Sequence, residues 1–404
     1  MFKCLFLFFI CPVLFLNGFL LSAQSFLPGQ TYYGANQYIE YHPGTLPIIF
    51  SAPHGGLVTP SNIADRTCNS PTVVTDSNTS DLAMQMDSAC LKAFGCHAHI
   101  IICNLKRTKL DCNRDVVNGT CGDPNATQAW NEFHSYVDTA VQEVLKKYGG
   151  GIYIDLHGQG HPIQRLELGY LITQTDLNRT DNSLDTSAND STFSMRHLLA
   201  AHPSALTLSK IIRGPSSIGT ALAARGYPSV PSQQDPFPAM ADPYFDGGYN
   251  TNRYGSDNGG TIDGLQIESN FTGVRDTPGN RKKFADTLIS VLHTFLDTYD
   301  QFSPLNLGTC NSVLTDAAGP AKADVELTLF PNPVCGSVSL RFSSRQQHLQ
   351  IRCIDMTGQC VFELNAGDQS ELTIPLQELA SGCYFLNLQS EAGLFNRKFF
   401  ITPH

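Results

Sequence analysis

Two short apolar runs, each ending in a histidine beside glycine, constrain the fold of this chain most. One is Leu46-Pro-Ile-Ile-Phe-Ser-Ala-Pro-His-Gly-Gly56, and the other is Gly149-Gly-Gly-Ile-Tyr-Ile-Asp-Leu-His-Gly158. Short apolar runs bounded by glycine are typical of buried strands in an α/β sheet. Open α/β sheets bind their ligands at the carboxyl ends of the strands. The two runs therefore predict that His54 and His157 share one metal site.

The remaining segments up to residue 300 alternate between strand and helix patterns. Residues 97–104 and 261–270 are apolar strand runs, and residues 126–148 and 280–299 have the apolar spacing of helices. A further helix is expected after Asp76, with Asp76 or Ser77 as its N-cap. This order predicts an α/β fold with a mixed, largely parallel sheet flanked by helices.

Length and charge restrict the classes of partner. The chain has 404 residues, of which 42% are hydrophobic, which is enough for two domains with a sizeable core. Its formal net charge is -10, and no run of lysine or arginine offsets it. We therefore expect no nucleic-acid partner and no anionic membrane partner.

The N-terminus has the form of a targeting segment. Lys3 precedes a nearly continuous apolar run over residues 5–21, and Ser22-Ala23 offers small residues for cleavage. Residues 1–23 are therefore predicted to be a signal peptide, with a membrane anchor as the alternative. Thirteen cysteines make disulfides plausible in an exported chain, and their pairing stays open.

The C-terminal part changes to an all-β pattern. Residues 309–324 are small and polar and read as a linker, and residues 325–404 contain about seven short strand runs between turns, which predicts a small β-sandwich. This part resembles the C-terminal sorting domain of type IX secretion. The matching pieces are Leu329-Phe-Pro-Asn-Pro333, Ile354-Asp-Met-Thr-Gly358, Leu379-Ala-Ser-Gly-Cys-Tyr-Phe385 and Arg397-Lys-Phe-Phe-Ile401. The resemblance implies export through the type IX machinery; a carbohydrate-binding or adhesion sandwich is the alternative.

The residue types around the two histidines suit a metal ion. A catalytic zinc site needs three protein ligands and one open position, and imidazole is a common ligand. The natural third ligand is a carboxylate, for which Asp76 and Asp81 are the candidates. Asp155, two residues before His157, could orient a histidine from behind. A single loop histidine is more often a structural residue, so the case depends on both histidines occurring in the same context.

Two further groups could serve catalysis. Arg107, Asn113 and Arg114 follow the 97–104 run, and guanidinium groups bind carboxylates in a bidentate manner. The alternative is a solvated loop in which Asp111 and Asp115 pair with the arginines. Glu268 ends the last strand run, where a carboxylate beside a metal could act as a general base; a structural ion pair is the alternative.

Five motifs, in order along residues 45–300, resemble the N-formylglutamate amidohydrolase family, which is related to zinc carboxypeptidases and aspartoacylases. They are Pro53-His-Gly-Gly56, Asp76 with Thr79-Ser-Asp-Leu-Ala83, Arg107 with Asp111-Cys-Asn-Arg114, Ile154-Asp-Leu-His157 and Leu265-Gln-Ile-Glu268. The resemblance implies one zinc ion held by His54, Asp76 and His157. The related carboxypeptidases have an acidic ligand three residues after the first histidine, where this chain has Leu57, so Asp81 stays as the alternative third ligand.

The same resemblance assigns roles to the remaining candidates. Glu268 would activate the attacking water, and Arg107 would stabilise the oxyanion. Asn113 and Arg114 would bind a substrate carboxylate. His161, four residues after His157, departs from the family pattern and could touch metal or substrate.

The sequence thus predicts a secreted, zinc-dependent amidohydrolase that cleaves the C–N bond of a small N-acyl amino acid or a peptide. The alternatives are a metallocarboxypeptidase or peptidoglycan-type peptidase, and a non-catalytic surface-binding protein with a degenerate site. The predicted organisation is a signal peptide (1–23), a catalytic domain (24–308), a linker (309–324) and a sorting domain (325–404).

Overall fold

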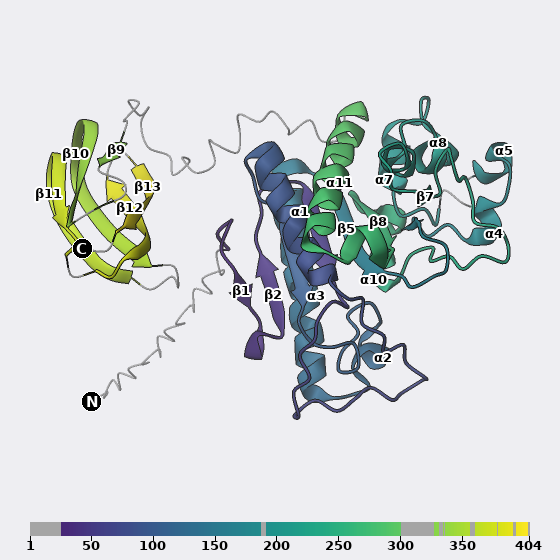
Figure 1. The fold of residues 1–404 in the computed structure, drawn as a ribbon. Helices are drawn as coiled ribbons and strands as arrows, with labels where there is room; N and C mark the ends of the chain where they lie inside the picture. Colours follow the sequence, from purple (N-terminus) through teal and green to yellow (C-terminus); the bar gives the residue numbers. More distant parts are fainter. Residues whose placement is uncertain are drawn as a thin grey trace, which may run out of the picture. The chain divides into compact units, whose positions relative to one another are not determined.

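The structure is a computed structural model. In it the chain forms two compact units, residues 1–310 and 311–404. It describes residues 26–186, 191–299, 327–330, 334, 336–355, 360–377, 379–390 and 393–402 (Figure 1). The predicted signal peptide and linker lie outside the described residues and stay predictions. Within the described residues, no helix combines the length and the apolar character needed to cross a membrane.

The first unit is built on an eight-stranded sheet with the strand order β1-β2-β4-β3-β5-β8-β6-β7. The four strands β4, β3, β5 and β8 are parallel neighbours, whereas β2 and β6 join them antiparallel on either side. The mixed, largely parallel sheet predicted from the sequence is therefore confirmed. The strands are β1 (Tyr32–Tyr33), β2 (Ile39–His42), β3 (Ile48–Ala52), β4 (His99–Cys103), β5 (Gly151–Gly158), β6 (Leu166–Gly169), β7 (Ser229–Val230) and β8 (Ile262–Ser269).

Three long helices cover the two faces of this sheet. Apolar side chains of α1 (Thr79–Phe94) and α11 (Pro278–Thr298) form one core with the strands. Those of α3 (Pro124–Tyr148) form the core on the opposite face. The N-cap prediction for α1 was wrong, because the helix begins at Thr79 with Asn78 as its N-cap residue. The carboxylate of Asp76 is thus not used in capping.

The shorter helices lie mainly between β5 and β8. Two of them are α7 (Arg196–Ala201) and α8 (Leu208–Arg213), with Pro203 between them. Figure 1 shows α4, α5, α7 and α8 gathered beside β7 at one end of the unit. The others are α2 (Val116–Thr120), α4 (Gln174–Leu177), α5 (Asp181–Leu184), α9 (Ile218–Ala223), α10 (Tyr249–Tyr254), η1 (Ala35–Gln37), η2 (Ser256–Asn258) and η3 (Phe271–Arg275).

Alternation along β5 separates apolar from polar side chains. Ile152, Ile154 and Leu156 belong to the core under α1 and α11. Successive strand residues point to opposite faces, so Tyr153, Asp155 and His157 face the side covered by α3. This alternation delivers the aspartate and the histidine to the same side at the carboxyl end of the strand.

The second unit is an antiparallel five-stranded sheet. Its order is β11-β10-β12-β13, with β9 paired to β10. The strands are β9 (Leu327–Phe330), β10 (Ser337–Asp355), β11 (Cys360–Pro375), β12 (Gly382–Ser390) and β13 (Gly393–Ile401). The expected all-β character is confirmed, but the described residues of the unit form five strands rather than about seven. The polar residues between Arg341 and Leu349 continue the pairing through shifts of register, so pairs of predicted short strands are joined into the long β10 and β11.

Candidate metal centre

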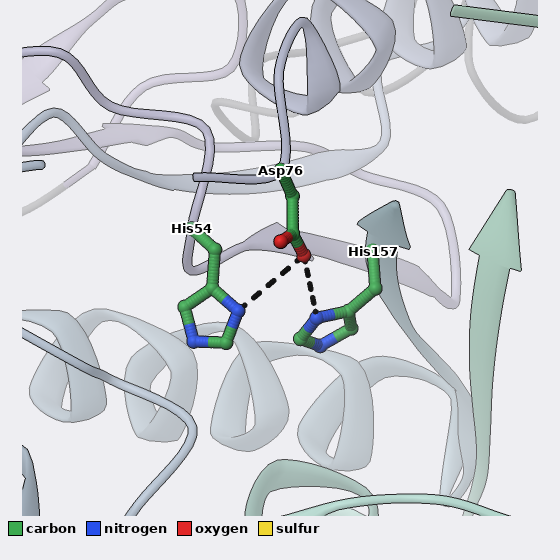
Figure 2. A group of neighbouring side chains, drawn as sticks. All are labelled: His54, Asp76 and His157. Carbon is green, nitrogen blue, oxygen red and sulfur yellow. Dashed lines mark hydrogen bonds and ion pairs between the residues drawn. The ribbon is translucent and has the colours of Figure 1, made fainter. Parts of the chain in front are cut away.

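Two histidines and an aspartate meet at the carboxyl edge of the parallel strands (Figure 2). His54 follows β3, Asp76 precedes α1, and His157 lies in β5. Asp76 Oδ2 is 3.4 Å from His54 Nδ1 and 3.1 Å from His157 Nδ1. One potential ligand atom from each residue lies within 4.8 Å of the others, and all three side chains are buried. The structure therefore brings together the three predicted metal ligands.

Glycines allow the loop of His54 to approach its neighbours closely. A Cβ on Gly55 would lie 2.6 Å from the backbone nitrogen of Ser80 at the start of α1, and one on Gly56 would lie 2.2 Å from the backbone of Asn104 after β4. The backbone N–H of Asp76 donates to the carbonyl of His54 at 3.1 Å. Because Gly55 and Gly56 have no side chains, the loop that carries His54 can pack against the segment that carries Asp76.

A buried carboxylate lies behind each imidazole. His54 Nε2 is 2.6 Å from Asp111 Oδ1, and His157 Nε2 is 2.7 Å from Asp155 Oδ2. An Nε2–H that donates to a carboxylate leaves the Nδ1 lone pair free for a metal. Among the described residues, His54 Nδ1 is buried without a hydrogen-bond partner.

The donor set fits a divalent cation. A tetrahedral zinc ion with Zn–N and Zn–O distances of about 2.0–2.1 Å holds its ligand atoms about 3.3 Å apart, close to the separations found here. Burial acts to lower the pKa of His157, but the charge of Asp155 and its hydrogen bond raise it well above its ordinary value. Burial acts to raise the pKa of Asp76, but the hydrogen bond with His157 and the nearby imidazole of His54 lower it. The surroundings favour positive charge at this point, which either a proton or a metal ion can supply.

Asp111 links the centre to two arginines. Its Oδ2 accepts from Arg107 Nε at 3.0 Å and lies 3.5 Å from Arg66. Although burial acts to raise it, the neighbouring imidazole and guanidinium groups hold the pKa of Asp111 well below its ordinary value. Arg107 also lies 3.7 Å from Asp76 Oδ1. Asp115 has a different role, because it caps α2 by accepting from two backbone N–H groups.

Asp155 is held by a separate set of polar groups. Ser51 donates to its Oδ1, the Tyr153 hydroxyl lies 3.3 Å from the same oxygen, and Asn250 Nδ2 donates to Oδ2 at 3.2 Å. These contacts fix the carboxylate behind His157, as expected for a residue that orients a ligand.

Glu268 lies beside His157 on the neighbouring strand. The two residues are paired in the register of β5 and β8, and Glu268 Oε1 is 4.0 Å from His157 Nδ1. Burial raises the pKa of Glu268 to about 8, with His157 opposing the shift and the carboxylates of Asp76 and Glu167 adding to it. A carboxyl group with a pKa in this range, next to a candidate metal site, has the properties of a general acid–base catalyst.

The two predicted carboxylate-binding residues differ in their surroundings. Asn113 is buried; its Nδ2 is 3.4 Å from His157 Nε2, and its Oδ1 accepts from the backbone of Asn250 at 2.8 Å. Arg114 is exposed, and its guanidinium donates to the carbonyl of Asn113 at 2.8 Å. The pair therefore extends from the centre to solvent, and its binding role stays a prediction.

The remaining candidates do not join the three-residue group. The side chain of Asp81 is 65% exposed and forms an ion pair with Arg281 at 3.3 Å, so the structure favours Asp76 over Asp81 as the third ligand. His161 Nδ1 is 2.7 Å from Glu167 Oε1, and its ring stacks on Phe245. His161 is therefore linked to the centre indirectly. Its partner Glu167 lies opposite Glu268 in the register of β6 and β8.

Sequence reasoning missed several residues that support the centre. Arg66, Glu167 and Asn250 had no assigned role, and Asp111 was considered only as an arginine partner. Each lies in an irregular segment, a short strand or, for Asn250, the short helix α10, and none of these has a recognisable sequence pattern. The disulfide between Cys68 and Cys121, which are 53 residues apart in sequence, ties the segment before Asp76 to the end of α2. Cysteine spacing alone left that pairing open.

The chain was compared with known proteins. Residues 328–402 match the family model of the secretion system C-terminal sorting domain. No curated protein matches the sequence significantly. Three solved structures are similar to parts of the chain. PorZ, a surface component of the type IX secretion system of Porphyromonas gingivalis, is 16% identical, covering 22% of this chain and 13% of its own, with a TM-score of 0.18.

For the other two structures, the similarity to this chain extends over almost all of the compared protein. An immunoglobulin-like β-sandwich protein from Bacteroides vulgatus is 20% identical, covering 20% of this chain and 98% of its own, with a TM-score of 0.17. N-formylglutamate amidohydrolase from Ralstonia eutropha is 12% identical, covering 65% of this chain and 98% of its own, with a TM-score of 0.38.

The family match confirms the expectation for the C-terminal part. It coincides with the five-stranded unit, whose strands run from Leu327 to Ile401. Residues 328–402 are therefore a type IX secretion C-terminal sorting domain, and the chain is a protein exported to the cell surface or the surrounding medium.

Proposed function

We propose that the first unit is a zinc-dependent amidohydrolase that cleaves the C–N bond of an N-acyl amino acid or a peptide. The observation that carries the proposal is the buried group of His54, Asp76 and His157 with Glu268 on the adjacent strand. Two histidines and one carboxylate with a nearby glutamate form a donor set that suits hydrolytic zinc. The sorting domain supports action outside the cell.

Each residue has a definite task in this proposal. When bound, zinc would polarise the substrate carbonyl and lower the pKa of water to about 7. Glu268 takes the proton from the attacking water and then delivers it to the leaving amine nitrogen, which is the proton balance of amide hydrolysis. Arg107, beside Asp76, directs a fixed positive charge towards the developing oxyanion.

Substrate binding is proposed for Asn113 and Arg114. The exposed guanidinium of Arg114 can form two hydrogen bonds to a carboxylate. A carboxylate adjacent to the scissile amide is common to N-acyl amino acids and to the C-termini of peptides. A peptidase acting on peptide C-termini or peptidoglycan is the second candidate, and the substrate panel below separates the two.

The test combines metal content with turnover on the full exported chain. We expect about one zinc per wild-type chain, loss of zinc in His157→Ala, and retention of zinc in His97→Ala, whose ring pairs with Asp87 outside the centre. Glu268→Gln should keep zinc while hydrolysis of N-acyl amino acids or short peptides falls at least about 100-fold.

The outcomes discriminate between the candidate functions. Turnover of N-acyl amino acids but not peptides supports the amidohydrolase, and the reverse supports the peptidase. Absence of zinc from wild-type protein after reconstitution would overturn the proposal and favour a non-catalytic binding protein.

A further inference from the structure

Arg275, which was not among the predicted site residues, is buried and contacts the segments that carry the site residues. Arg275 ends η3, seven residues after Glu268, and is only 3% exposed. Its Nε donates to the carbonyl of Ser269 at 3.1 Å, and one terminal nitrogen donates to that of Gln159 at 3.2 Å. The other terminal nitrogen donates to the carbonyl of Ser77. One guanidinium group thus binds three backbone carbonyls from three separate segments.

These carbonyls belong to residues one or two positions after the functional residues of the proposed centre. Ser77 follows Asp76, Gln159 lies two residues after His157, and Ser269 follows Glu268. We propose that Arg275 is a positioning residue that sets the spacing of two metal ligands and the general base. The proposal rests on the metal centre proposed above and deepens it.

The chemistry of the guanidinium group suits this task. It is planar, permanently charged, and presents five N–H donors in a rigid fork, whereas an ammonium group is a compact point charge. Each hydrogen bond from Arg275 is charge-assisted and lies in the interior, where such bonds are stronger than in water. Burial lowers the pKa of Arg275, and the nearby carboxylates of Asp76 and Glu268 oppose this shift.

Close contacts fix the position of the Arg275 guanidinium group. A Cβ on Gly158 would lie 2.3 Å from Arg275 Cζ, so only glycine leaves room at that position of β5. The Phe271 ring lies 5.5 Å from Cζ. The carbonyl of Arg275 accepts from Asn78 at 2.9 Å and from Arg281 at 2.7 Å. The backbone and the side chain of Arg275 are thus both fixed against the segment that precedes α1.

The chain offers a matched control in Arg213. This arginine is 8% exposed and donates to the carbonyls of Leu177, Arg179 and Pro236, far in sequence from the proposed ligands. Replacing either arginine by lysine removes a buried fork that donates to three backbone carbonyls. The Arg213 fork joins two segments, 177–179 and Pro236, and also pairs with Asp181. Only the Arg275 fork joins segments of the proposed centre.

The experiment measures zinc affinity by chelator competition on the full chain, together with the melting temperature. We expect Arg275→Lys to bind zinc about 10- to 100-fold more weakly than wild type, which is the usual loss when support behind metal ligands is removed. Arg213→Lys should lower the melting temperature by a similar amount and leave zinc affinity within about threefold of wild type. Equal zinc affinity in Arg275→Lys and wild type would overturn the inference.

A second variant covers the case in which Arg275→Lys fails to fold. Gly158→Ala displaces the guanidinium without removing it and should weaken zinc binding in the same range. Where both single variants fold, their combination should be less than additive, because both act on one contact; full additivity would count against the inference. Absence of zinc from wild-type protein would overturn the metal centre itself, and with it the role of Arg275.

Discussion

The two units of the molecule both have apolar cores, but they differ in how many charged side chains they bury. Near the proposed metal centre of the first unit, His54, Asp111, Asp155 and Glu268 are all less than 10% exposed. In the second unit, the buried side chains among the described residues are apolar apart from Gln346. Its ion pair between Arg341 and Glu371 lies in solvent, with side chains 61% and 52% exposed.

We infer from this difference that the buried charges of the first unit serve the proposed function rather than stability. Burying a charge costs several kcal/mol, and a buried ion pair is often no more stabilising than a well-packed apolar group. A chain selected only for stability would have no reason to place so many charges at one sheet edge. The second unit, whose core is apolar, follows the simpler rule that burial of apolar area stabilises the fold.

The largest expected effect comes from breaking the charge network in the first unit. Asp111→Asn keeps the shape of the side chain but leaves Arg66 and Arg107 without their shared carboxylate. Removing one partner of a buried ion pair costs about 3–5 kcal/mol, and we expect this loss in the free energy of unfolding, measured in urea. A change below about 1 kcal/mol would show that the network contributes little to stability.

The next effect tests the apolar rule in the second unit. Leu386 in β12 is fully buried, and Leu386→Ala should destabilise this unit by about 3 kcal/mol through lost transfer energy and the remaining cavity. Hydrogen exchange of β10 and β12 amides measures the effect within the unit. Asn387→Ala, at the next and less buried position, is the control. Unchanged protection in Leu386→Ala would contradict the prediction.

Local patterns were sufficient to predict much of the first unit. The runs that became β3 and β5 gave both the parallel sheet and the edge at which His54 and His157 meet, because parallel neighbours end at the same edge. The alternation of β5 placed Asp155 behind His157. In the second unit the same method separated β10 and β11 into shorter strands, because polar residues that remain paired look like turns in sequence.

Contacts between distant segments could not be predicted. Asp111 meets His54 and Arg275 meets Ser77, and no pattern near either residue in sequence predicts these contacts. The N-cap of α1 was placed at Asp76 or Ser77 because short polar residues at a helix start are usually caps. The structure gives that place to Asn78, and Asp76 points to the histidines.

A smaller effect concerns the pH dependence of the metal-free first unit. Burial raises the pKa of Glu268 from 4.5 to about 8, so between these values the folded state holds a proton that the unfolded state has lost. The stabilisation from this group is complete below pH 4.5 and is lost as the pH rises through about 8. The free energy of unfolding should fall by about 1.4 kcal/mol per pH unit over this range from Glu268 alone.

The comparison of wild type with Glu268→Gln isolates this contribution. Urea unfolding of metal-free protein at several pH values should show a shallower slope in the variant. Zinc should also reduce the slope in wild type, because a nearby cation favours the carboxylate form. Parallel slopes for the metal-free wild type and variant would contradict the raised pKa.

The smallest effect is expected from replacing a carboxylate by an amide at the surface of the second unit. This is the same chemical change as in Asp111→Asn. Glu371→Gln replaces a carboxylate by an amide opposite Arg341, in a cross-strand pair of β10 and β11 with an N–O distance of 3.0 Å. Exposed ion pairs contribute about 0.2–1 kcal/mol, and salt screens them. We therefore expect a change of at most about 1 kcal/mol by hydrogen exchange of the β10 amides, decreasing further at high salt. A loss comparable to that of Asp111→Asn would show that burial does not decide the value of a charge in this protein.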